Sequence, residues 1–408
     1  MKKLNVLFIS IAFPPKQDSE GLQVAKYLKY LLKDKSLTID VVTSEDKTLF
    51  MPIYTNLVEY LTGVRQIIKV PFFENKYSNF IKRKINRSSL NYPDSKYRFY
   101  KKWKYVVDEL KKKPDVIYSR SYPLSSTLMA YYLQKEFKIP WILHLSDPWT
   151  INPIHALEDA QHWNSIAEKK CFHHASMITF TSEETLNLYI LKYPNFKTKM
   201  MLSYNVFDLE DKKIKFFMFK DKLKIVYTGG LAGERSPEYI LNAIVLFEKN
   251  YPQIINDFEF IFAGALDKKN SVLFKGVPKS VKHLGLLSFE NALKLQESAD
   301  ILLVIDILFD DVNDAIFFPS KLLDYMLSEK RVLALTTKGS PTWNIVNDKM
   351  GNCVEHRDID AIVQFFRITW EKWKLEDKDY FVRQEIDMKF SAEQNAQKIS
   401  NALKRLVV

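Results

Sequence analysis

Hydrophobic and polar positions follow two alternating patterns along the chain. Short apolar runs, rich in branched and aromatic residues, lie at 4–10, 37–43, 115–119, 140–146, 176–182 and 199–205. Such runs are typical of strands that are buried on both faces of a parallel sheet. Longer stretches between them, such as 20–34 and 124–137, carry apolar residues at helical spacing. Strands that alternate with helices predict a parallel sheet with helices on both faces.

The first apolar run also has the length of a signal-peptide core, because it follows Lys2 and Lys3. It leads into Pro14 and Pro15, however, and not into a small-residue cleavage site. No stretch reaches the roughly 18 uncharged apolar residues that a membrane-spanning helix needs. We therefore expect residues 4–10 to form the first strand.

A densely charged segment, 208–221, interrupts the alternation, and the pattern then starts again. Strands are predicted at 223–229, 257–264, 281–285, 299–306 and 331–337, and helices at about 237–250, at 288–298 and from Lys321. The tail, 390–406, predicts an amphipathic helix with Ser391 as its N-cap. The predicted organisation is a domain over 1–207, a linker over 208–221, a second domain over 222–387 and a C-terminal helix over 388–408. Packing of that helix on the first domain is one option.

Length and composition agree with two globular domains. The 408 residues exceed one core and suit domains of about 200 residues each. The hydrophobic fraction of 47% excludes a disordered chain. Cys171 and Cys353 lie far apart, with no metal-like spacing. Dinucleotide, P-loop, zinc-protease and nucleophile-elbow motifs are absent, which disfavours hydride transfer, nucleotide hydrolysis and hydrolase chemistry.

The net charge of +11 is concentrated in one segment. Residues 65–113 hold fifteen Lys and Arg against four Asp and Glu, so this segment alone carries +11. Phe, Tyr and Trp residues are interleaved with the cations, a composition that suits the interface of an anionic membrane. A solvated helical face is the alternative. Nucleic acid is disfavoured as a partner because no reader motif accompanies the charge.

The helix predicted from Lys321 places a cation at its first position. In helical phase Leu322, Leu323, Met326 and Leu327 share one face, and Lys321, Asp324, Tyr325 and Ser328 share the other. Lys321 and Asp324 are neighbours one turn apart, where a helix N-terminus exposes unpaired N–H groups. The pair therefore forms either a surface ion pair or part of an anion site.

Several motifs resemble, in their order, those of GT-B fold glycosyltransferases. They are LFISIAFPP with SEG, IPWILHLSDPW, YTGGLAGERSPEYILNA, VKHLGLLSFENALKLQESADILLVI and FPSKLLDYMLSEKRVLAL. The chain most resembles the family 4 retaining enzymes of bacterial surface-polysaccharide assembly, over nearly its whole length. The resemblance implies an α/β GT-B fold, in which two doubly wound Rossmann-like domains face across a cleft. It also implies a nucleotide-diphosphate-sugar donor in the second domain, an acceptor in the first, and neither metal nor cofactor.

The same resemblance assigns roles to individual positions. Catalytic positions are Asp147, Arg235 and Lys321, and donor-binding positions are Gly21, Gly229, Gly230, Arg235, His283, Leu284, Pro319, Ser320, Lys321 and Asp324. Arg235 and Lys321 would clamp the diphosphate, with backbone N–H groups of 318–320 assisting. Asp324 would accept from the ribose hydroxyls, and 281–284 would line the base. Gly21 matches a flexible loop near the donor phosphates, or is a helix-start glycine. Asp147 ends a strand that faces the cleft, and its alternative is an N-cap or turn aspartate.

Two positions depart from the family pattern. Ser146 stands where the family often has a His before the Asp, while His144 lies two residues earlier. Ile316 replaces the first acid of the Glu-x7-Glu motif, and Asp314 lies nearby. The resemblance implies a retaining transferase on the inner face of the cell membrane, acting on a lipid-linked or polysaccharide acceptor such as O-antigen or capsule. A catalytically silent GT-B subunit and a sugar-nucleotide epimerase are the alternatives.

Overall fold

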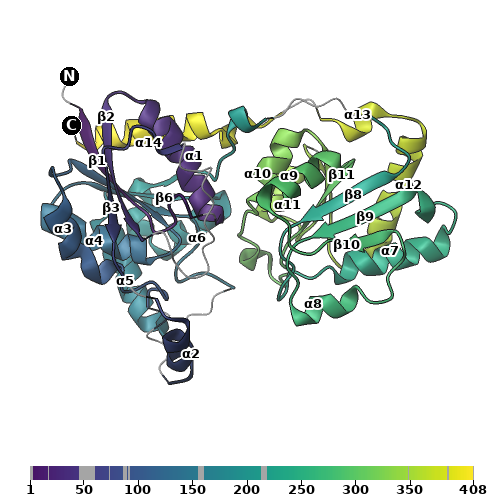
Figure 1. Cartoon of the computed structure of the whole chain (residues 1–408), viewed down its shortest axis with the longest axis horizontal. Coiled ribbons are helices and arrows are strands. Elements are labelled where there is room, and N and C mark those ends of the chain that lie inside the picture. Colours follow the sequence, from purple (N-terminus) through teal and green to yellow (C-terminus); the bar gives the residue numbers. More distant parts are fainter. Residues whose placement is uncertain are drawn as a thin grey trace. The chain divides into compact units, whose positions relative to one another are not determined.

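The computed structural model describes residues 3–16, 18–45, 60–72, 74–85, 90, 92–154, 160–212, 218–347, 349–383 and 386–407. The chain divides into two compact units. Unit 1 contains residues 1–209 and 388–408, and unit 2 contains residues 210–387. The chain thus leaves unit 1 once and returns to it for its last segment (Figure 1).

Unit 1 is built on a parallel sheet. Its strands are β1 (Leu4–Ile9), β2 (Leu37–Ser44), β3 (Gln66–Val70), β4 (Val116–Ser121), β5 (Trp141–Leu145), β6 (Met177–Phe180) and β7 (Met200–Leu202). They lie side by side in the order β3-β2-β1-β4-β5-β6-β7, each parallel to its neighbours. The order reverses between β1 and β4, which is the topological switch point where α/β sheets bind ligands.

Helices cover both faces of this sheet. They are α1 (Ser19–Lys33), α2 (Lys76–Ile85), α3 (Trp103–Glu109), α4 (Ser125–Phe137), α5 (Gln161–His174), α6 (Glu183–Lys192) and α14 (Ala392–Arg405). Val6 and Phe8 of β1 join a core with α1 and α14, whereas Leu7 and Ile9 join the opposite core with α4 and α5. Because successive side chains of a strand point to opposite faces, β1 is apolar at both. This explains why the first strand has no alternation of apolar and polar residues.

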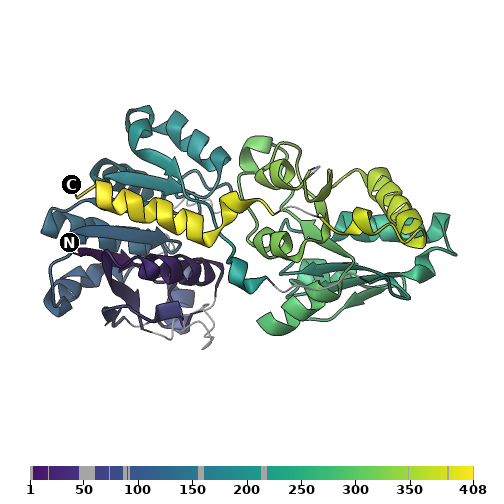
Figure 2. The ribbon, with the colours of Figure 1, turned by 90° about the horizontal axis from the view of Figure 1, so that it is seen from above.

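The C-terminal helix α14 lies along α1, as Figure 2 shows. Ile399 and Leu403 are fully buried in the core they share with α1. Ser400 Oγ and Lys404 Nζ both donate to Asp34 Oδ2, at the end of α1, over 2.6 Å each. The apolar stripe and its polar edge together fix α14 on unit 1.

Unit 2 repeats the architecture with a second parallel sheet. Its strands are β8 (Leu223–Thr228), β9 (Phe258–Ala263), β10 (Val281–His283), β11 (Ile301–Ile305), β12 (Arg331–Leu335) and β13 (Gly351–Val354), in the order β10-β9-β8-β11-β12-β13. Its helices are α7 (Glu238–Asn250), α8 (Lys268–Leu273), α9 (Phe289–Ser298), α10 (Lys321–Ser328), α11 (Pro341–Val346), α12 (Ile359–Lys374) and α13 (Lys378–Phe381). The order reverses between β8 and β11, so a second switch point lies there.

The predicted α/β class with two parallel sheets is confirmed. Two edge strands, β3 and β13, were not predicted. The first lies in the basic segment, and Gly351 begins the second, so neither shows the apolar run of a buried strand. Among the described residues no helix is long and apolar enough to cross a membrane.

Candidate functional site

The residues predicted to bind a donor gather at the switch point of unit 2. Gly229 directly follows β8, Asp306 directly follows β11, and Lys321 begins α10. Because β8 and β11 are parallel neighbours, their carboxyl ends open at one edge of the sheet. The topology alone therefore brings these three positions together.

A glycine turn forms the floor of this site. Gly229 has φ +136° and Gly264, in the loop after β9, has φ +149°. A Cβ on Gly264 would lie 1.9 Å from the Gly229 carbonyl oxygen, and a Cβ on Gly229 would lie 2.7 Å from Lys321 Nζ. The backbone contact excludes a side chain at Gly264, and the positive φ favours glycine at both positions. The lysine ammonium therefore lies directly against the backbone of the turn.

Lys321 carries a cation that the protein itself does not satisfy. Its Nζ is buried and has no hydrogen-bond partner among the described residues. It lies 4.0 Å from the centroid of the Tyr227 ring, a cation–π distance. Burial, followed by repulsion from Arg235, lowers the pKa of Lys321 to about 7, with Asp306 opposing. A buried donor of this kind needs a partner that the chain does not supply.

Arg235 is the second cation of the site. Its Nε is likewise buried without a hydrogen-bond partner among the described residues. Asp306 is a carboxylate that offsets the Lys321 charge, and its Oδ2 accepts from Thr336 Oγ1 over 2.7 Å. Burial raises the pKa of Asp306, because the ionised carboxylate is disfavoured where water is excluded. Two cations against one carboxylate leave a positive site that suits an anion.

Helix α10 presents its N-terminus at this site. The N-cap residue Ser320 makes no side-chain cap, and Asp324 is the acidic residue of the first turn, so backbone N–H groups at this end are available to an anion. At the opposite end Arg383 Nη2 donates to the Tyr325 carbonyl over 2.8 Å. Tyr325, which shares a helix face with Lys321 and Asp324, is fully buried, and its hydroxyl is 3.4 Å from the Leu303 carbonyl. Tyr325 docks the helix on β11.

The other predicted donor residues lie around this centre. Pro319, Ser320 and Asp324 are half-buried next to Lys321. His283 Nε2 donates to the Gly264 carbonyl over 3.0 Å, which ties β10 to the glycine turn. Leu284, which follows β10, is 48% exposed. Apolar and imidazole groups thus border the glycine turn on its β10 side.

Ile316, one of the two positions that depart from the family pattern, lies in the hydrophobic core. Ile316 is only 3% exposed, so its side chain is part of the packing. Asp314 ends a short 3₁₀ turn, Val312–Asp314, and is exposed. An exposed carboxylate two residues away does not occupy the position of the missing acid.

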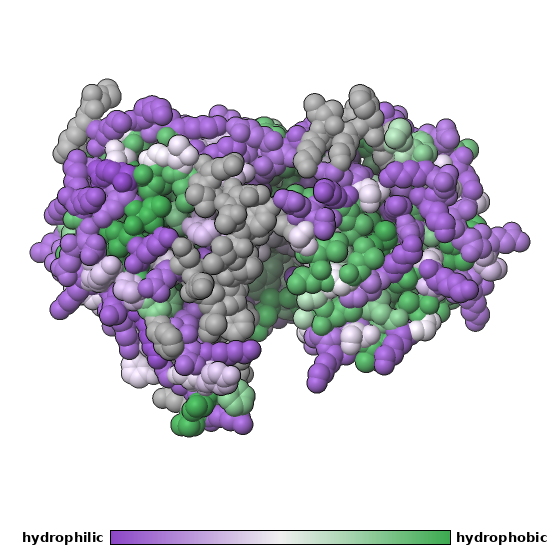
Figure 3. Space-filling view, in the orientation of Figure 1, coloured by the Kyte–Doolittle hydropathy of each residue, from purple (hydrophilic) through white to green (hydrophobic). Residues whose placement is uncertain are grey.

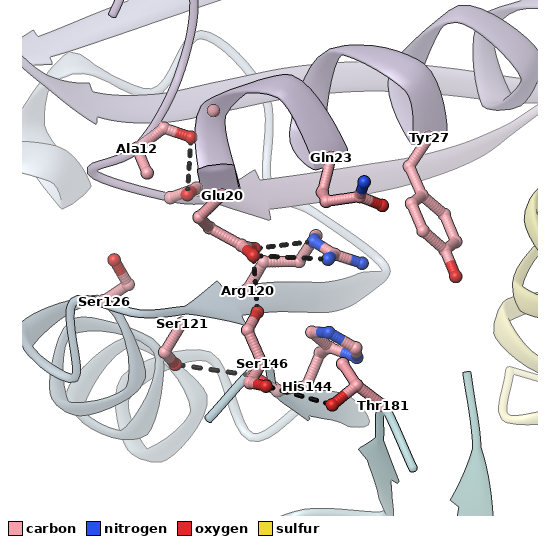
Figure 4. Close-up of polar contacts among 12 residues, drawn as sticks. Ala12, Glu20, Gln23, Tyr27, Arg120, Ser121, Ser126, His144, Ser146 and Thr181 are labelled. Carbon is pink, nitrogen blue, oxygen red and sulfur yellow. Dashed lines mark hydrogen bonds and ion pairs between the residues drawn. The ribbon is translucent and has the colours of Figure 1, made fainter. Parts of the chain in front are cut away.

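A polar network surrounds the switch point of unit 1 (Figure 4). Glu20 Oε1 accepts from Arg120 Nε over 2.8 Å, and both side chains are buried. Glu20 Oε2 accepts from Ser146 Oγ over 2.5 Å. Arg120 is the second-last residue of β4, and Ser146 follows β5. Glu20 therefore links α1, β4 and the end of β5.

The sequence reasoning did not single out Glu20 or Arg120. They are a hundred residues apart, so their pairing is invisible to local patterns. The available signal was the charge of Arg120 in the otherwise uncharged sequence of β4. An unpaired charge buried there would be costly, which indicates a partner. Ser146, which stands where the family often has a histidine, joins this pair.

Asp147 comes directly after this network and is half-buried. Burial raises the pKa of Asp147 to about 6, and its carboxylate has no hydrogen-bond partner among the described residues. His144 is fully buried; its Nδ1 is 2.8 Å from Thr179 Oγ1, and burial lowers its pKa well below 6.5. A carboxyl group that titrates near neutrality is suited to proton transfer or to charge stabilisation.

Gly21 lies in the first turn of α1, so it is a helix-start glycine, which was one of the two interpretations of this position. Its N–H donates to Asp18 Oδ1, the N-cap of the helix, over 2.7 Å. A Cβ there would lie 2.5 Å from the Lys16 carbonyl oxygen. Gly21 is needed for this close approach, and contact with a donor stays a prediction.

Chemically, the two units offer different groups. Unit 2 offers cations, a helix N-terminus and a glycine turn, which suit phosphate groups. Unit 1 offers a carboxyl group with a raised pKa. Among the described residues no group of three or more His, Cys, Asp or Glu is placed to hold a metal ion.

No protein-family model and no curated protein sequence matches the chain. Solved structures do resemble it over its whole length. They include the N-terminal domain of trehalose-6-phosphate phosphatase from Candida albicans, with 14% identity, a TM-score of 0.66 and coverage of 100% of this chain and 97% of that chain. The lipopolysaccharide outer core galactosyltransferase WaaB has 12% identity and a TM-score of 0.59, covering 98% and 99% of the two chains. UDP-GlcNAc 2-epimerase from Methanocaldococcus jannaschii has 12% identity and a TM-score of 0.53, covering 99% and 100%. At such identities the likeness establishes the fold, which is GT-B with two Rossmann-like domains.

Proposed function

We propose that the protein is a glycosyltransferase that uses a nucleotide-diphosphate-sugar as its donor. The observation that carries this proposal is the unsatisfied ammonium of Lys321 against the Gly229 turn, with Arg235 as a second cation. A departing nucleoside diphosphate gains negative charge as the sugar bond breaks. Two fixed cations and a helix N-terminus, already placed and shielded from water, favour that charge without reorganisation.

The diphosphate would lie between the glycine turn and the α10 N-terminus, and this places the rest of the donor. Asp324, three residues further along α10, would accept from the ribose hydroxyls. The base would lie toward 281–284, beside His283 and Leu284. The clamp needs no divalent cation, because Lys321 and Arg235 supply the positive charge themselves.

The acceptor would bind to unit 1, with Asp147 as the carboxyl group at the reacting centre. Transfer with retention of configuration, and a lipid-linked or polysaccharide acceptor such as O-antigen or capsule, are the finer parts of the proposal. The likeness to a lipopolysaccharide galactosyltransferase is consistent with them. The basic and aromatic composition of 65–113 supports attachment to the inner face of an anionic membrane, where a lipid-linked acceptor would be met.

An epimerase is the second candidate, favoured by the likeness to UDP-GlcNAc 2-epimerase. Such an enzyme would use the same diphosphate site but need no acceptor. A catalytically silent subunit is a third reading, because the buried Ile316 stands where the family has a glutamate. It would bind the donor without turnover.

One experiment separates these candidates. The purified protein is incubated with UDP-, GDP- and ADP-sugars that give a thermal shift, with and without a membrane lipid extract as acceptor. A transferase releases nucleoside diphosphate at a rate that depends on the acceptor, and chelator leaves that rate unchanged. An epimerase converts the sugar without an acceptor, which would overturn the proposal, as would binding with no turnover in any extract.

A further inference from the structure

An amphipathic helix of a globular protein usually turns its apolar side toward the core. Helix α2 does the opposite, because its polar side faces the protein. Asn79 is only 8% exposed. Lys82 Nζ donates to the Tyr97 hydroxyl, and Asn75 Oδ1 accepts from the backbone N–H groups of Tyr77 and Ser78 over 2.8 and 3.2 Å. Asn75 therefore caps the start of α2, whereas the buried Asn79 and the Lys82–Tyr97 hydrogen bond turn the polar side of α2 toward unit 1.

The apolar side of α2 points away from the protein. Tyr77 is 81% exposed, Phe80 58%, Ile81 54% and Ile85 81%. These four positions recur at helical spacing and share one face. In Figure 3 green side chains mark the lower tip of unit 1, where Figure 1 places α2. Single exposed apolar residues are ordinary, but four on one ten-residue helix form a binding face.

Lysines are mixed into this face. Lys76 and Lys84 are exposed, and Lys84 Nζ lies 4.9 Å from the centroid of the Phe80 ring. The centres of protein–protein interfaces are depleted in lysine, since an ammonium is costly to dehydrate there. At a membrane the lysine stem stays among the lipid tails while its ammonium reaches the phosphate groups. The pattern of charge and apolar residues thus favours a membrane over a protein partner.

Part of the basic segment is already engaged inside unit 1. Arg65 pairs with Asp40, and Lys96 is buried in an ion pair with Glu74. Cations that are already paired inside unit 1 cannot reach lipid phosphates. In the described part of 65–113, helix α2 combines exposed cations with several exposed apolar side chains.

We propose that α2 docks unit 1 on an anionic membrane by laying Tyr77, Phe80, Ile81 and Ile85 into the interface. A ten-residue helix is about 15 Å long, too short to span a bilayer but suited to lie in its surface. Lys76 and Lys84 then contact the lipid phosphates. The inference deepens the proposed function and rests on it for the lipid-linked acceptor, but docking itself needs no substrate.

Flotation with vesicles of phosphatidylglycerol and phosphatidylethanolamine tests this proposal. The wild type should float, and part of that binding should persist at 1 M salt, where the screening length is about 3 Å, because apolar insertion is not screened. The variant Phe80→Ser, Ile81→Ser, Ile85→Ser should lose at least tenfold in vesicle partition. A matched control, Leu191→Ser, Leu286→Ser, Leu375→Ser, removes three exposed apolar side chains elsewhere, each more exposed than Phe80 and Ile81, and should bind like the wild type. The charge variant Lys76→Gln, Lys84→Gln should lose the preference for anionic vesicles.

Unchanged flotation of the α2 triple variant would overturn the docking proposal. The proposal would also be overturned if the variant floats like the wild type but has a different molar mass in solution. The apolar face of α2 would then bind a second copy of the chain. All variants should keep the far-ultraviolet circular dichroism and melting temperature of the wild type, since the altered side chains are exposed. They should also keep the nucleotide-sugar thermal shift. If the wild type shows no thermal shift with any nucleotide-sugar, the proposed function is contradicted. The docking of α2 on vesicles is a separate result and is not affected.

Discussion

The ammonium of Lys321 lies 4.0 Å from the centroid of the Tyr227 ring, at the carboxyl edge of the unit 2 sheet. The ring face stabilises the cation only in part, because Nζ has no hydrogen-bond partner among the described residues. A diphosphate oxygen would complete the set. The position of Lys321 against the Tyr227 ring thus follows from the fold of unit 2 and supports the proposed binding of a diphosphate there.

The donor affinity should depend on pH through Lys321. Burial lowers its pKa to about 7, below the 10.5 of an ordinary lysine, so the unliganded protein loses this proton as the pH rises through 7. The diphosphate binds the protonated form, and binding above pH 7 must take up a proton. Affinity for a nucleotide-sugar should be constant below about pH 7 and fall by up to about tenfold per pH unit above it.

Titration calorimetry between pH 6 and pH 9 measures this dependence. Lys321→Arg is the matched control, since a guanidinium stays charged over that range and should flatten the curve. A wild-type affinity that does not change from pH 6 to pH 9 would show that Lys321 does not contact the diphosphate.

Asp147→Asn should stabilise the protein while it abolishes transfer. Burial raises the folded-state pKa to about 6 from 3.8, so the ionised carboxylate destabilises the folded state above pH 6. That penalty decreases as the pH falls through 6 and is gone below about 4. The variant should therefore melt higher than the wild type at pH 8, with the difference vanishing toward pH 4.

Melting curves at four pH values, together with a transfer assay at pH 8, check both halves of this prediction. A variant that is less stable than the wild type at pH 8 would mean that the carboxylate is held by interactions other than burial. Retained transfer would remove Asp147 from the catalytic positions.

The buried pair of Glu20 and Arg120 should reveal itself by a double-mutant cycle. Glu20→Ala leaves the buried guanidinium uncompensated, which typically costs about 3–5 kcal/mol. Glu20→Ala with Arg120→Met removes both charges and should recover most of that loss. Denaturant unfolding of the wild type, Glu20→Ala, Arg120→Met and the double variant gives the four free energies, and simple addition of the two single effects would contradict the pairing.

Asp324 should discriminate ribose from 2′-deoxyribose. A carboxylate that accepts from both hydroxyls weakens the binding of a 2′-deoxy donor, since one partner is missing. In Asp324→Ala that preference should collapse, and Asp324→Asn should keep part of it. Equal preference in the wild type and Asp324→Ala would assign the carboxylate to another task.

Most of the strands, and the gathering of Gly229 and Lys321 at one edge of the unit 2 sheet, could be predicted from the sequence for identifiable reasons. Buried parallel strands are continuous apolar runs, so β1 and β11 were readable without any structure. Lys321 and Arg235 stand out because each cation follows a turn motif. Asp306 and Tyr227, in contrast, lie at the ends of apolar strands. Their place beside Lys321 follows only from the pairing of β8 with β11 in the folded sheet.

Two features of unit 1 could not be reached in that way. The pairing of Glu20 with Arg120 joins residues a hundred positions apart. Helix α2 has a readable apolar stripe, but periodicity does not say which side faces the protein. Asn79 and Lys82 decide that, through contacts that only the folded chain provides.

The central claim is that Lys321 and Arg235 hold a nucleotide diphosphate, and titration calorimetry with UDP, GDP and ADP at pH 6.5 tests it most directly. At least one of these ligands should bind the wild type and the control Lys249→Ala, whose lysine lies in the last turn of α7. Lys321→Ala and Arg235→Ala should each weaken that binding on the order of 10²-fold, because truncating one partner of a buried charge pair costs about 2–5 kcal/mol. Binding of none of the three ligands, or equal affinity in the control and both variants, would contradict the account.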